Sequence, residues 1–280
     1  MLETSPQSKA LALRSLHEDG TLVLPNAWDA GSAVMIAEAG ARAIATTSGG
    51  VAWSHGKPDG QRLSRNEMVG VIRAIAAAVD VPVTADIEGG YGPAPEDVAA
   101  TVSAVVAVGA AGINLEDSVA GGGPLFTVAE QAARLRAARE AAARGGLAEL
   151  VINARTDVYL FGIGAPEGRL DDVLTRASAY AEAGADCLFV PGLLDLEVLT
   201  ALADEAPLPL NAMAMPGGPG IAELSASGVR RISTGTAVAQ AAYTLAGRAA
   251  TEILEQGTYT ELAGALDFAG VDSLFAQRPH

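Results

Sequence analysis

The chain has 280 residues, half of them hydrophobic and 4% aromatic, which is enough for one large core and near the usual length of an α/β barrel. A formal net charge of -15 and a pI near 4.5 argue against nucleic acids and membranes as partners, because the field repels polyanions. No apolar run has the roughly 18 residues that a membrane span needs, and the N-terminus does not resemble a signal peptide. We therefore expect a cytoplasmic protein that binds small molecules.

Taken in chain order, the sequence predicts an alternation of strands and helices. Residues 1–20 are expected to form an N-terminal helix. Eight short apolar runs rich in β-branched residues follow, each succeeded by a turn and an alanine-rich segment with helical spacing. These predicted strands cover residues 21–28, 41–48, 81–88, 112–117, 150–157, 187–192, 207–215 and 230–235. An open doubly wound sheet would also alternate, but eight units favour a closed α/β fold, the (β/α)8 TIM-type barrel.

Punctuation residues support this alternation. Pro95 with Glu96 and Asp97 is typical of the first turn of a helix, and Gly109 of a helix end. Gly40, Gly184 and Gly228 stand at the matching place before other predicted strands.

We predict a single barrel domain over residues 1–280, in which the N-terminal helix is followed by the barrel at 21–245 and a helical extension at 246–280. This tail is longer than one closing helix requires, which suggests contacts within an oligomer. A helical cap folded back on its own barrel is the alternative, and composition does not separate the two.

Polar residues gather where the predicted strands end, which is the mouth at which barrel enzymes carry their sites. A ring of acids at one mouth repels itself unless solvent, raised pKa values or a bound cation relieves it. Asp86 and Glu88, two residues apart on an extended strand end, point to the same side and favour the cation. Mg²⁺, or Mn²⁺ in its place, suits such oxygen ligands. For Asp29, Asp117 and Asp157, helix capping or solvation explains the residue equally well. The strand-end residues are Asp29, Thr47, Ser48, Asp86, Glu88, Glu116, Asp117, Arg155, Asp157 and Asn211.

Other chemistries lack their residues. The two lysines, Lys9 and Lys57, fall outside the predicted strands, so a Schiff-base mechanism has no obvious amine. The three histidines form no HxxxH or HxH pair for zinc, and no GxSxG motif is present. Cys187 is the single cysteine, which excludes an internal disulfide.

Two glycine-rich stretches remain open to two interpretations. Residues 120–124, after the fourth predicted strand, have the composition of either a mobile flap or a plain turn. Residues 215–220 and 233–237 follow the seventh and eighth strands, where many barrels bind phosphate on backbone amides. Glycine and proline are also common in ordinary turns at this place.

Several strand-end motifs together resemble the isocitrate lyase and phosphoenolpyruvate mutase superfamily. They are LPNAWDAGSA (24–33), ATTSGGVAWSHGKPDG (45–60), ADIEGGYG (85–92), GINLEDS (112–118), INARTD (152–157) and the segment around Asn211. The resemblance implies a barrel in which one helix is exchanged between subunits of a homodimer or homotetramer. It also implies Mg²⁺, a 2-oxo acid or dicarboxylate substrate, and an enolate intermediate.

By position, the resemblance implies a role for nine residues. Asp86 would be the direct metal ligand, while Asp59, Glu88 and Glu116 would hold metal-bound waters. Arg155 would pair with the substrate carboxylate or carbonyl oxygen. Substrate-binding groups would come from Ser48, Gly49, Gly50, Arg155 and Asn211, and the catalytic residues would be Arg155, Asp59 and Ser48.

The chain departs from the better-known members after the fourth strand. Residues 118–127, SVAGGGPLFT, lack the cysteine, lysine and histidine of the lyases and the Lys-x-Asn pair of the mutases. Pro191 and Gly192 replace the acid that several lyases carry at the end of the sixth strand. Tyr91, His55 or a water would have to act as general acid, and Trp53 and Met213 are candidates for substrate discrimination.

These observations lead to three hypotheses of function. The first is a Mg²⁺-dependent lyase that cleaves a C–C bond next to the carbonyl of a small 2-oxo-acid-derived substrate. The second is a phosphonopyruvate-type mutase or hydrolase that breaks a P–C bond. The third is a 2-oxo-acid-binding protein without catalytic activity.

Overall fold

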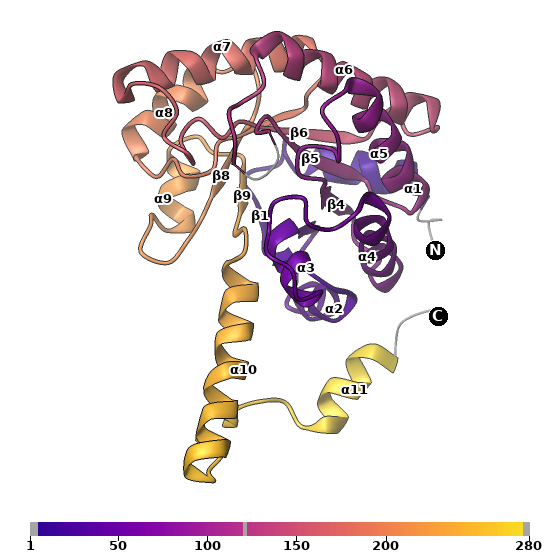
Figure 1. Cartoon of the computed structure of the whole chain (residues 1–280), viewed down its shortest axis with the longest axis vertical. Coiled ribbons are helices and arrows are strands. Elements are labelled where there is room, and N and C mark those ends of the chain that lie inside the picture. Colours follow the sequence, from indigo (N-terminus) through magenta and orange to yellow (C-terminus); the bar gives the residue numbers. More distant parts are fainter. Residues whose placement is uncertain (1–4, 120–121, 277–280) are drawn as a thin grey trace.

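In the computed structural model, which describes residues 5–119 and 122–276, one parallel sheet is surrounded by helices (Figure 1). The strands are β1 (Leu22–Leu24), β2 (Asn26–Ala27), β3 (Ile44–Thr46), β4 (Val83–Asp86), β5 (Gly112–Glu116), β6 (Val151–Arg155), β7 (Cys187–Phe189), β8 (Leu210–Met213) and β9 (Arg231–Ser233). The α-helices are α1 (Pro6–Ser15), α2 (Ala30–Glu38), α3 (Ser48–Ser54), α4 (Arg65–Ala78), α5 (Pro95–Ala107), α6 (Val128–Arg144), α7 (Arg169–Glu182), α8 (Leu196–Glu205), α9 (Ile221–Ala226), α10 (Ala237–Gln256) and α11 (Phe268–Ala276). Two short 3₁₀ turns are η1 (Pro166–Gly168) and η2 (Thr260–Leu262).

The sheet runs β1-β9-β8-β7-β6-β5-β4-β3-β2 with every pairing parallel. Its two ends, β1 and β2, belong to the single predicted strand 21–28, so this strand closes the barrel. Pro25 divides it because proline has no N–H to donate to a ladder. The prediction of a (β/α)8 barrel is confirmed.

The pairing register gives the tilt of the barrel. Leu22 pairs with Arg231, and following the paired residues once around the barrel leads back to position 30 of the same chain. This displacement of eight residues is the shear expected of a TIM barrel. The same shear places the inward side chains in layers, and each layer contains four side chains from alternate strands.

Several helix ends match the predicted punctuation, since α5 begins at Pro95 and α2, α7 and α9 end two residues before Gly40, Gly184 and Gly228. The helix predicted over residues 1–20 ends earlier, because α1 stops at Ser15. Ser64 and Thr127 each accept a hydrogen bond from the backbone of a glutamate three residues later and so cap α4 and α6. Gly40, Gly184 and Gly228 adopt φ values of 98°, 96° and 88°, which a residue with a Cβ rarely adopts. At the amino ends of the strands, α1 covers the barrel, and a Cβ on Gly112 would lie 2.9 Å from Leu13 Cδ2.

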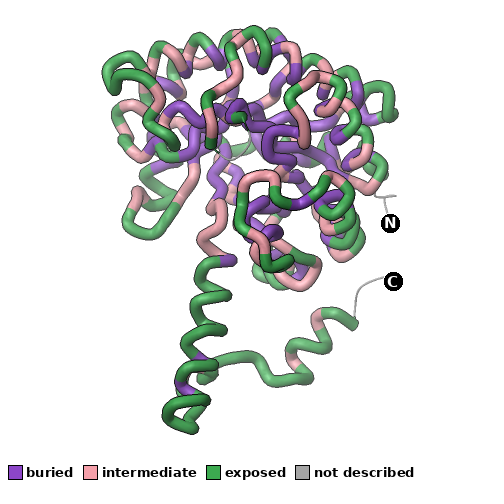
Figure 2. The backbone as a smooth tube through the Cα atoms, in the orientation of Figure 1, coloured by how far each residue is buried: buried purple, intermediate pink, exposed green. Residues whose placement is uncertain are grey.

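The C-terminal segment departs from the barrel surface. Figures 1 and 2 show α10 projecting away from the barrel, with most of its length exposed, before the chain turns back through α11. The domain boundary that we expected at 245–246 falls inside α10, which continues without a break. No helix in residues 5–119 and 122–276 is long and apolar enough to cross a membrane.

Candidate active site at the barrel mouth

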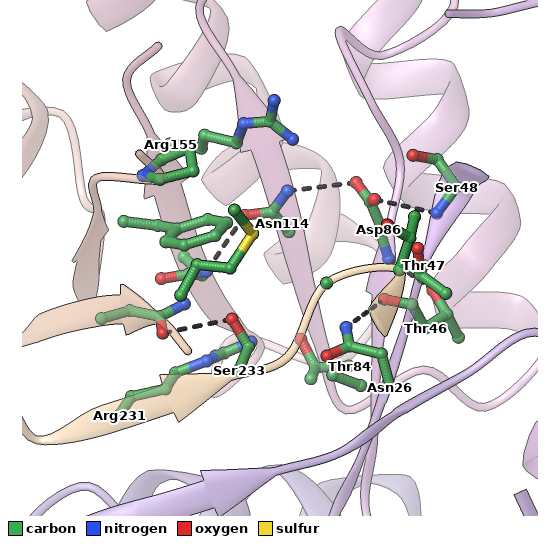
Figure 3. A pocket seen from close by; sticks show the side chains of 18 of the residues that line it. Asn26, Thr46, Thr47, Ser48, Thr84, Asp86, Asn114, Arg155, Arg231 and Ser233 are labelled. Carbon is green, nitrogen blue, oxygen red and sulfur yellow. Dashed lines mark hydrogen bonds between the residues drawn. The ribbon is translucent and has the colours of Figure 1, made fainter. Parts of the chain in front are cut away.

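A cavity of about 200 Å³ opens at the carboxyl ends of the strands and reaches into the barrel (Figure 3). Most of its lining residues are polar, and one apolar side is formed by Leu160, Phe189, Pro191 and Met213. The other lining residues are Asn26, Ala45, Thr46, Thr47, Ser48, Asp59, Thr84, Asp86, Asn114, Asn153, Arg155, Asn211, Arg231, Ser233, Gly235 and Thr236.

Asp86 is held firmly at the last position of β4. Its Oδ2 accepts from the Ser48 backbone N–H at 3.0 Å, and its Oδ1 accepts from Asn114 Nδ2 at 3.1 Å and from the Glu88 backbone N–H at 3.2 Å. These donors fix the carboxylate, and because a carboxylate accepts about four hydrogen bonds, they leave capacity on the cavity side. Asp86 is thus a carboxylate with a fixed orientation at the mouth.

Asp59 and the start of α3 lie against each other on the same wall. Burial raises the pKa of Asp59, which accepts hydrogen bonds from the Gly60 backbone and the Ser48 side chain. A Cβ on Gly49 would lie 3.0 Å from Asp59 Oδ2, and one on Gly50 would lie 2.9 Å from Trp28 Cβ. Glycine is therefore required at both positions by close packing.

Glu88 belongs to a loop that other residues hold in an uncommon conformation. Glu88 and Tyr91 have φ values of 49° and 62°. The Glu88 carboxylate accepts from the Gln61 backbone N–H and from Tyr91 Oη at 3.1 Å. Arg134 of α6 donates to the carbonyl oxygens of Gly89, Gly92 and Pro93 and so anchors the loop from below.

Arg155, at the end of β6, is the cation of the mouth. Its Nη1 lies 3.0 Å from Glu116 Oε2 and its Nε lies 2.5 Å from Asp157 Oδ1. Partial burial lowers the pKa of Arg155, but the charges of Glu116 and Asp157 outweigh this effect and hold the pKa above its usual value. The guanidinium faces two acids and the cavity together.

The acids of the mouth disfavour one another's charge. Burial, and then the charge of Asp86, raise the pKa of Glu88 to about 7. Burial raises the pKa of Glu116 to about 8, although Arg155 opposes the rise. Shifts of this size mark functional sites more often than other regions of a protein.

The nine predicted site residues fall into two groups. Ser48, Asp59, Asp86, Arg155 and Asn211 line the cavity. Gly49, Gly50, Glu88 and Glu116 stand behind this lining, next to residues that belong to it. Among residues 5–119 and 122–276, no three His, Cys, Asp or Glu side chains are close enough to hold one metal ion together. A metal here would have few direct protein ligands.

Three inward-facing polar residues on β4, β5 and β6 are among those that the sequence did not predict. Asn114 donates to Asp86 and accepts from Asn153 Nδ2 at 3.0 Å, which links β4, β5 and β6. Thr84 precedes Asp86 by two residues and also lines the cavity. Each stands two residues before a predicted site residue within an apolar strand, and this spacing was the available signal.

Several predicted alternatives are resolved by their contacts. Asp29 caps α2 by accepting from the Ser32 backbone N–H at 2.6 Å. Asp117 is buried and pairs with Arg176 at 3.0 Å, so both acids have structural roles. Tyr91 donates to Glu88 and the His55 ring contacts Val51 O at 3.0 Å; neither lines the cavity. Trp53 stacks edge-on against Tyr243 and also lies outside the lining.

The structure describes most residues of the two glycine-rich stretches, and some of them line the cavity. Residues 120–121 of the predicted flap lie outside the described residues, and an isolated bridge joins Ser118 to Leu125 on either side of them. Of the predicted phosphate-binding residues, Ser233, Gly235 and Thr236 line the cavity.

The barrel with an acidic, arginine-containing mouth defines this protein as a TIM-barrel protein with a candidate site for a small anionic ligand. The family model described as phosphoenolpyruvate phosphomutase matches residues 13–254. The chain therefore belongs to this family, which is part of the isocitrate lyase and phosphoenolpyruvate mutase superfamily.

Relatives include proteins of known and unknown activity. An uncharacterised protein of Mycobacterium tuberculosis is 37% identical over 227 residues, 81% of this chain and 82% of the relative. The 2-methylisocitrate lyase of Escherichia coli K12 is 33% identical over 206 residues, 71% of this chain and 67% of the relative.

Solved structures agree with this assignment. The structure of oxaloacetate acetylhydrolase with its product oxalate has a TM-score of 0.86 at 27% identity, covering 97% of this chain and 95% of the other. Phosphonopyruvate hydrolase with oxalate and Mg²⁺ has a TM-score of 0.83 at 26% identity, covering 95% and 94%. The relatives whose activity is named are lyases, mutases and hydrolases.

Proposed function

We propose that the protein is a Mg²⁺-dependent lyase that cleaves a C–C bond next to the carbonyl of a small 2-oxo-acid-derived substrate through an enolate. The observation that carries the proposal is the fixed Asp86 carboxylate facing a cavity that also exposes Arg155. Such a cavity offers a cation site and a carboxylate site side by side.

The residues present fit Mg²⁺. This ion keeps several waters and needs only one or two carboxylates from the protein. Asp86 would hold the ion directly, and Asp59, Glu88 and Glu116 would accept hydrogen bonds from the waters that the ion keeps. Burial, together with the charges of neighbouring acids, raises the pKa values of Asp59, Glu88 and Glu116, and a cation among them would remove the repulsion. When bound, Mg²⁺ supplies Lewis-acid stabilisation of negative charge on the substrate carbonyl oxygen.

The protein's own groups bind and orient the substrate. Arg155 pairs with the substrate carboxylate, while Glu116 and Asp157 fix the plane of its guanidinium. The Gly49 and Gly50 N–H groups, in the first turn of α3, have no partner within the helix and stand next to Ser48, which lines the cavity. The Ser48 backbone N–H already donates to Asp86. The remaining donor of Ser48 is its side-chain hydroxyl, which also contacts Asp59.

The apolar side of the cavity limits the substrate. Leu160, Phe189, Pro191 and Met213 present no polar side-chain group to a ligand, so we expect the substrate to carry a small alkyl substituent there.

Product analysis tests the proposal directly. Purified protein with Mg²⁺ is incubated with oxaloacetate, 2-methylmalate and related 2-oxo and 2-hydroxy acids, and ¹³C NMR identifies the cleavage products. We expect turnover of at least one of these acids that stops when EDTA removes the metal. Absence of turnover across the panel would refute the lyase activity.

A P–C bond substrate is the second candidate. Gly235 and Thr236, in the stretch predicted to bind phosphate, line the same cavity, and the matching family model is that of a phosphomutase. Phosphorus NMR of a phosphonopyruvate reaction separates the two activities, since a P–C reaction yields phosphoenolpyruvate or inorganic phosphate.

The raised pKa values predict how stability depends on pH. In the metal-free protein, Glu88 and Glu116 bind protons more tightly when folded, with pKa values of about 7 and about 8, than the ordinary 4.5 when unfolded. Stability therefore falls as pH rises from about 5 to about 8. We expect the thermal midpoint to fall across this window without metal and to recover on adding Mg²⁺, most at the alkaline end. A metal-free midpoint that rises from pH 5 to 8 would contradict this prediction.

We also propose that a second copy of this chain covers the C-terminal arm, α10 to α11. Apolar side chains on the arm are exposed in the single chain, among them Leu254 at 83% and Phe268 at 86%. An exposed apolar surface of this kind is typical of an oligomer interface.

Solution mass tests this assembly. The wild-type chain is expected to behave as a homodimer or homotetramer in light scattering, and the double variant Leu254→Asp, Phe268→Asp is expected to shift toward the monomer. Leu11→Asp, an exposed leucine on α1, is the control and should leave the mass unchanged. A monomeric wild type would refute the assembly.

A further inference from the structure

An arginine lies inside the barrel, closer to the amino ends of the strands than the candidate active site. Arg231 is the first residue of β9, is 2% exposed, and lines the inner end of the cavity (Figure 3). Inward positions of TIM barrels are normally filled by branched apolar side chains. The pairing register places Arg231 in one layer with Ala43, Gly112 and Cys187, which are all small residues.

This arginine has no counter-charge among the described residues. Its Nε and Nη1 are buried and have no hydrogen-bond partner there. Burial raises the pKa of the Cys187 thiol to about 12, and the thiol donates to Pro209 O, so Cys187 is neutral. Burial lowers the pKa of His17 to about 4, so His17 is neutral as well. A buried charge without a partner is costly, so the Arg231 guanidinium favours binding of an anion at this place.

The layer above Arg231 is also polar and also incompletely bonded. It contains Thr84, Asn153 and Asn211, and in each of them one buried atom lacks a partner among the described residues: Thr84 Oγ1, Asn153 Oδ1 and Asn211 Nδ2. All three line the same cavity as Arg231. The Asn211 amide and the Thr84 hydroxyl can donate to an anion, and Asn153 Oδ1 can accept from a water that accompanies it.

We propose that Arg231, Asn211 and Thr84 form an anion-binding subsite inside the barrel that takes a carboxylate group. A planar carboxylate matches the fork of the guanidinium, and its single charge balances that of Arg231. A phosphate dianion would instead add excess negative charge beneath the acids of the mouth.

Two sources of this carboxylate are open to test: a free small carboxylate, and the distal carboxylate of a dicarboxylic substrate bound at the mouth. Arg231 lies three layers below Asp86, a difference in height of about 8 Å along the barrel axis at the rise and tilt of barrel strands. A five- or six-carbon dicarboxylic acid spans this length. The second source rests on the proposed function, and the first does not.

Formate is the probe for the subsite itself. In metal-free buffer, formate is expected to raise the thermal midpoint of the wild-type protein, and the Arg231→Met variant is expected to lose this response. Arg230→Met removes the neighbouring, exposed arginine and should respond like the wild type. If Arg231→Met does not fold, Thr84→Val takes its place, and we expect this variant to keep the fold. It should weaken formate binding about fivefold, because it loses one hydrogen bond to the anion. The proposal is overturned if wild type does not respond, or if Arg231→Met responds equally.

Ligand length identifies the source. With Mg²⁺ present, calorimetry compares pyruvate, 2-oxoglutarate and 2-oxoadipate. If the substrate's distal carboxylate occupies the subsite, Arg231→Met weakens a dicarboxylic ligand about tenfold to a hundredfold and leaves pyruvate unchanged. Equal affinities in both proteins overturn the substrate source and assign the subsite to free anions. A formate response without binding of any 2-oxo acid refutes the proposed function and leaves the subsite standing.

Discussion

Replacing Asp86 with asparagine is expected to lower kcat/KM of the Mg²⁺-dependent reaction by about a thousandfold or more, since Lewis-acid stabilisation contributes several kcal/mol. Asparagine has nearly the same shape, but it has no negative charge for the metal. Its NH₂ group would also face at least one of the N–H donors that now hold the carboxylate. Those donors are the backbone N–H groups of Ser48 and Glu88 and the amide of Asn114. The fold should survive, because these contacts form a small part of a large core.

The matched control is Asp29→Asn. Asp29 also stands at the end of a predicted strand, but it caps α2, and asparagine caps a helix as well as aspartate does. Steady-state kinetics and thermal unfolding of both variants check the prediction. Equal kinetics for wild type and Asp86→Asn would remove Asp86 from the site.

Replacing Arg155 with glutamine is expected to abolish activity and to lower the free energy of unfolding by about 3–5 kcal/mol, the usual cost of breaking a buried ion pair from one side. The change leaves Glu116 and Asp157 without the cation that contacts both, and Asp157 is fully buried. The loss should be larger at pH 8 than at pH 6, because Glu116 is more often charged there.

Arg155→Lys separates charge from geometry. Lysine retains the positive charge and should recover much of the stability, but it cannot hold two acids and a substrate carboxylate with one planar group. We expect its activity to stay about a hundredfold or more below wild type, as for the loss of a charge-assisted contact. Urea unfolding with kinetics on the same samples measures both effects. Full stability in Arg155→Gln would contradict the role of this ion pair.

The fold follows from local sequence patterns because strands and helices alternate regularly. Glycines such as Gly40 and Gly184, with positive φ, mark where helices end, and eight apolar runs give eight barrel positions. The break at Pro25 was not predicted, since a proline within an apolar run also fits the edge of one strand. The strand-end acids and Arg155 were found because a barrel gathers strand ends at one mouth.

The interior of the barrel was harder to predict. Asn114 and Asn153 form a hydrogen-bonded link to Asp86, but a single asparagine in an apolar strand carries no sign of its partner. Arg231 follows Arg230 in the sequence, and only the register shows that one points into the barrel while the other is exposed. Roles of Asp29 and Asp117 likewise depended on contacts with residues that the strand-end pattern does not specify.

Calorimetric titration of oxalate, a stable analogue of the enolate of a 2-oxo acid, probes the metal-dependent site at the mouth without requiring the true substrate. We expect the wild-type protein to bind oxalate in the presence of Mg²⁺, EDTA to abolish this binding, and Asp86→Asn not to bind under either condition. Binding of oxalate that is unaffected by EDTA, or by the loss of Asp86, would contradict a metal-dependent 2-oxo acid site at this mouth.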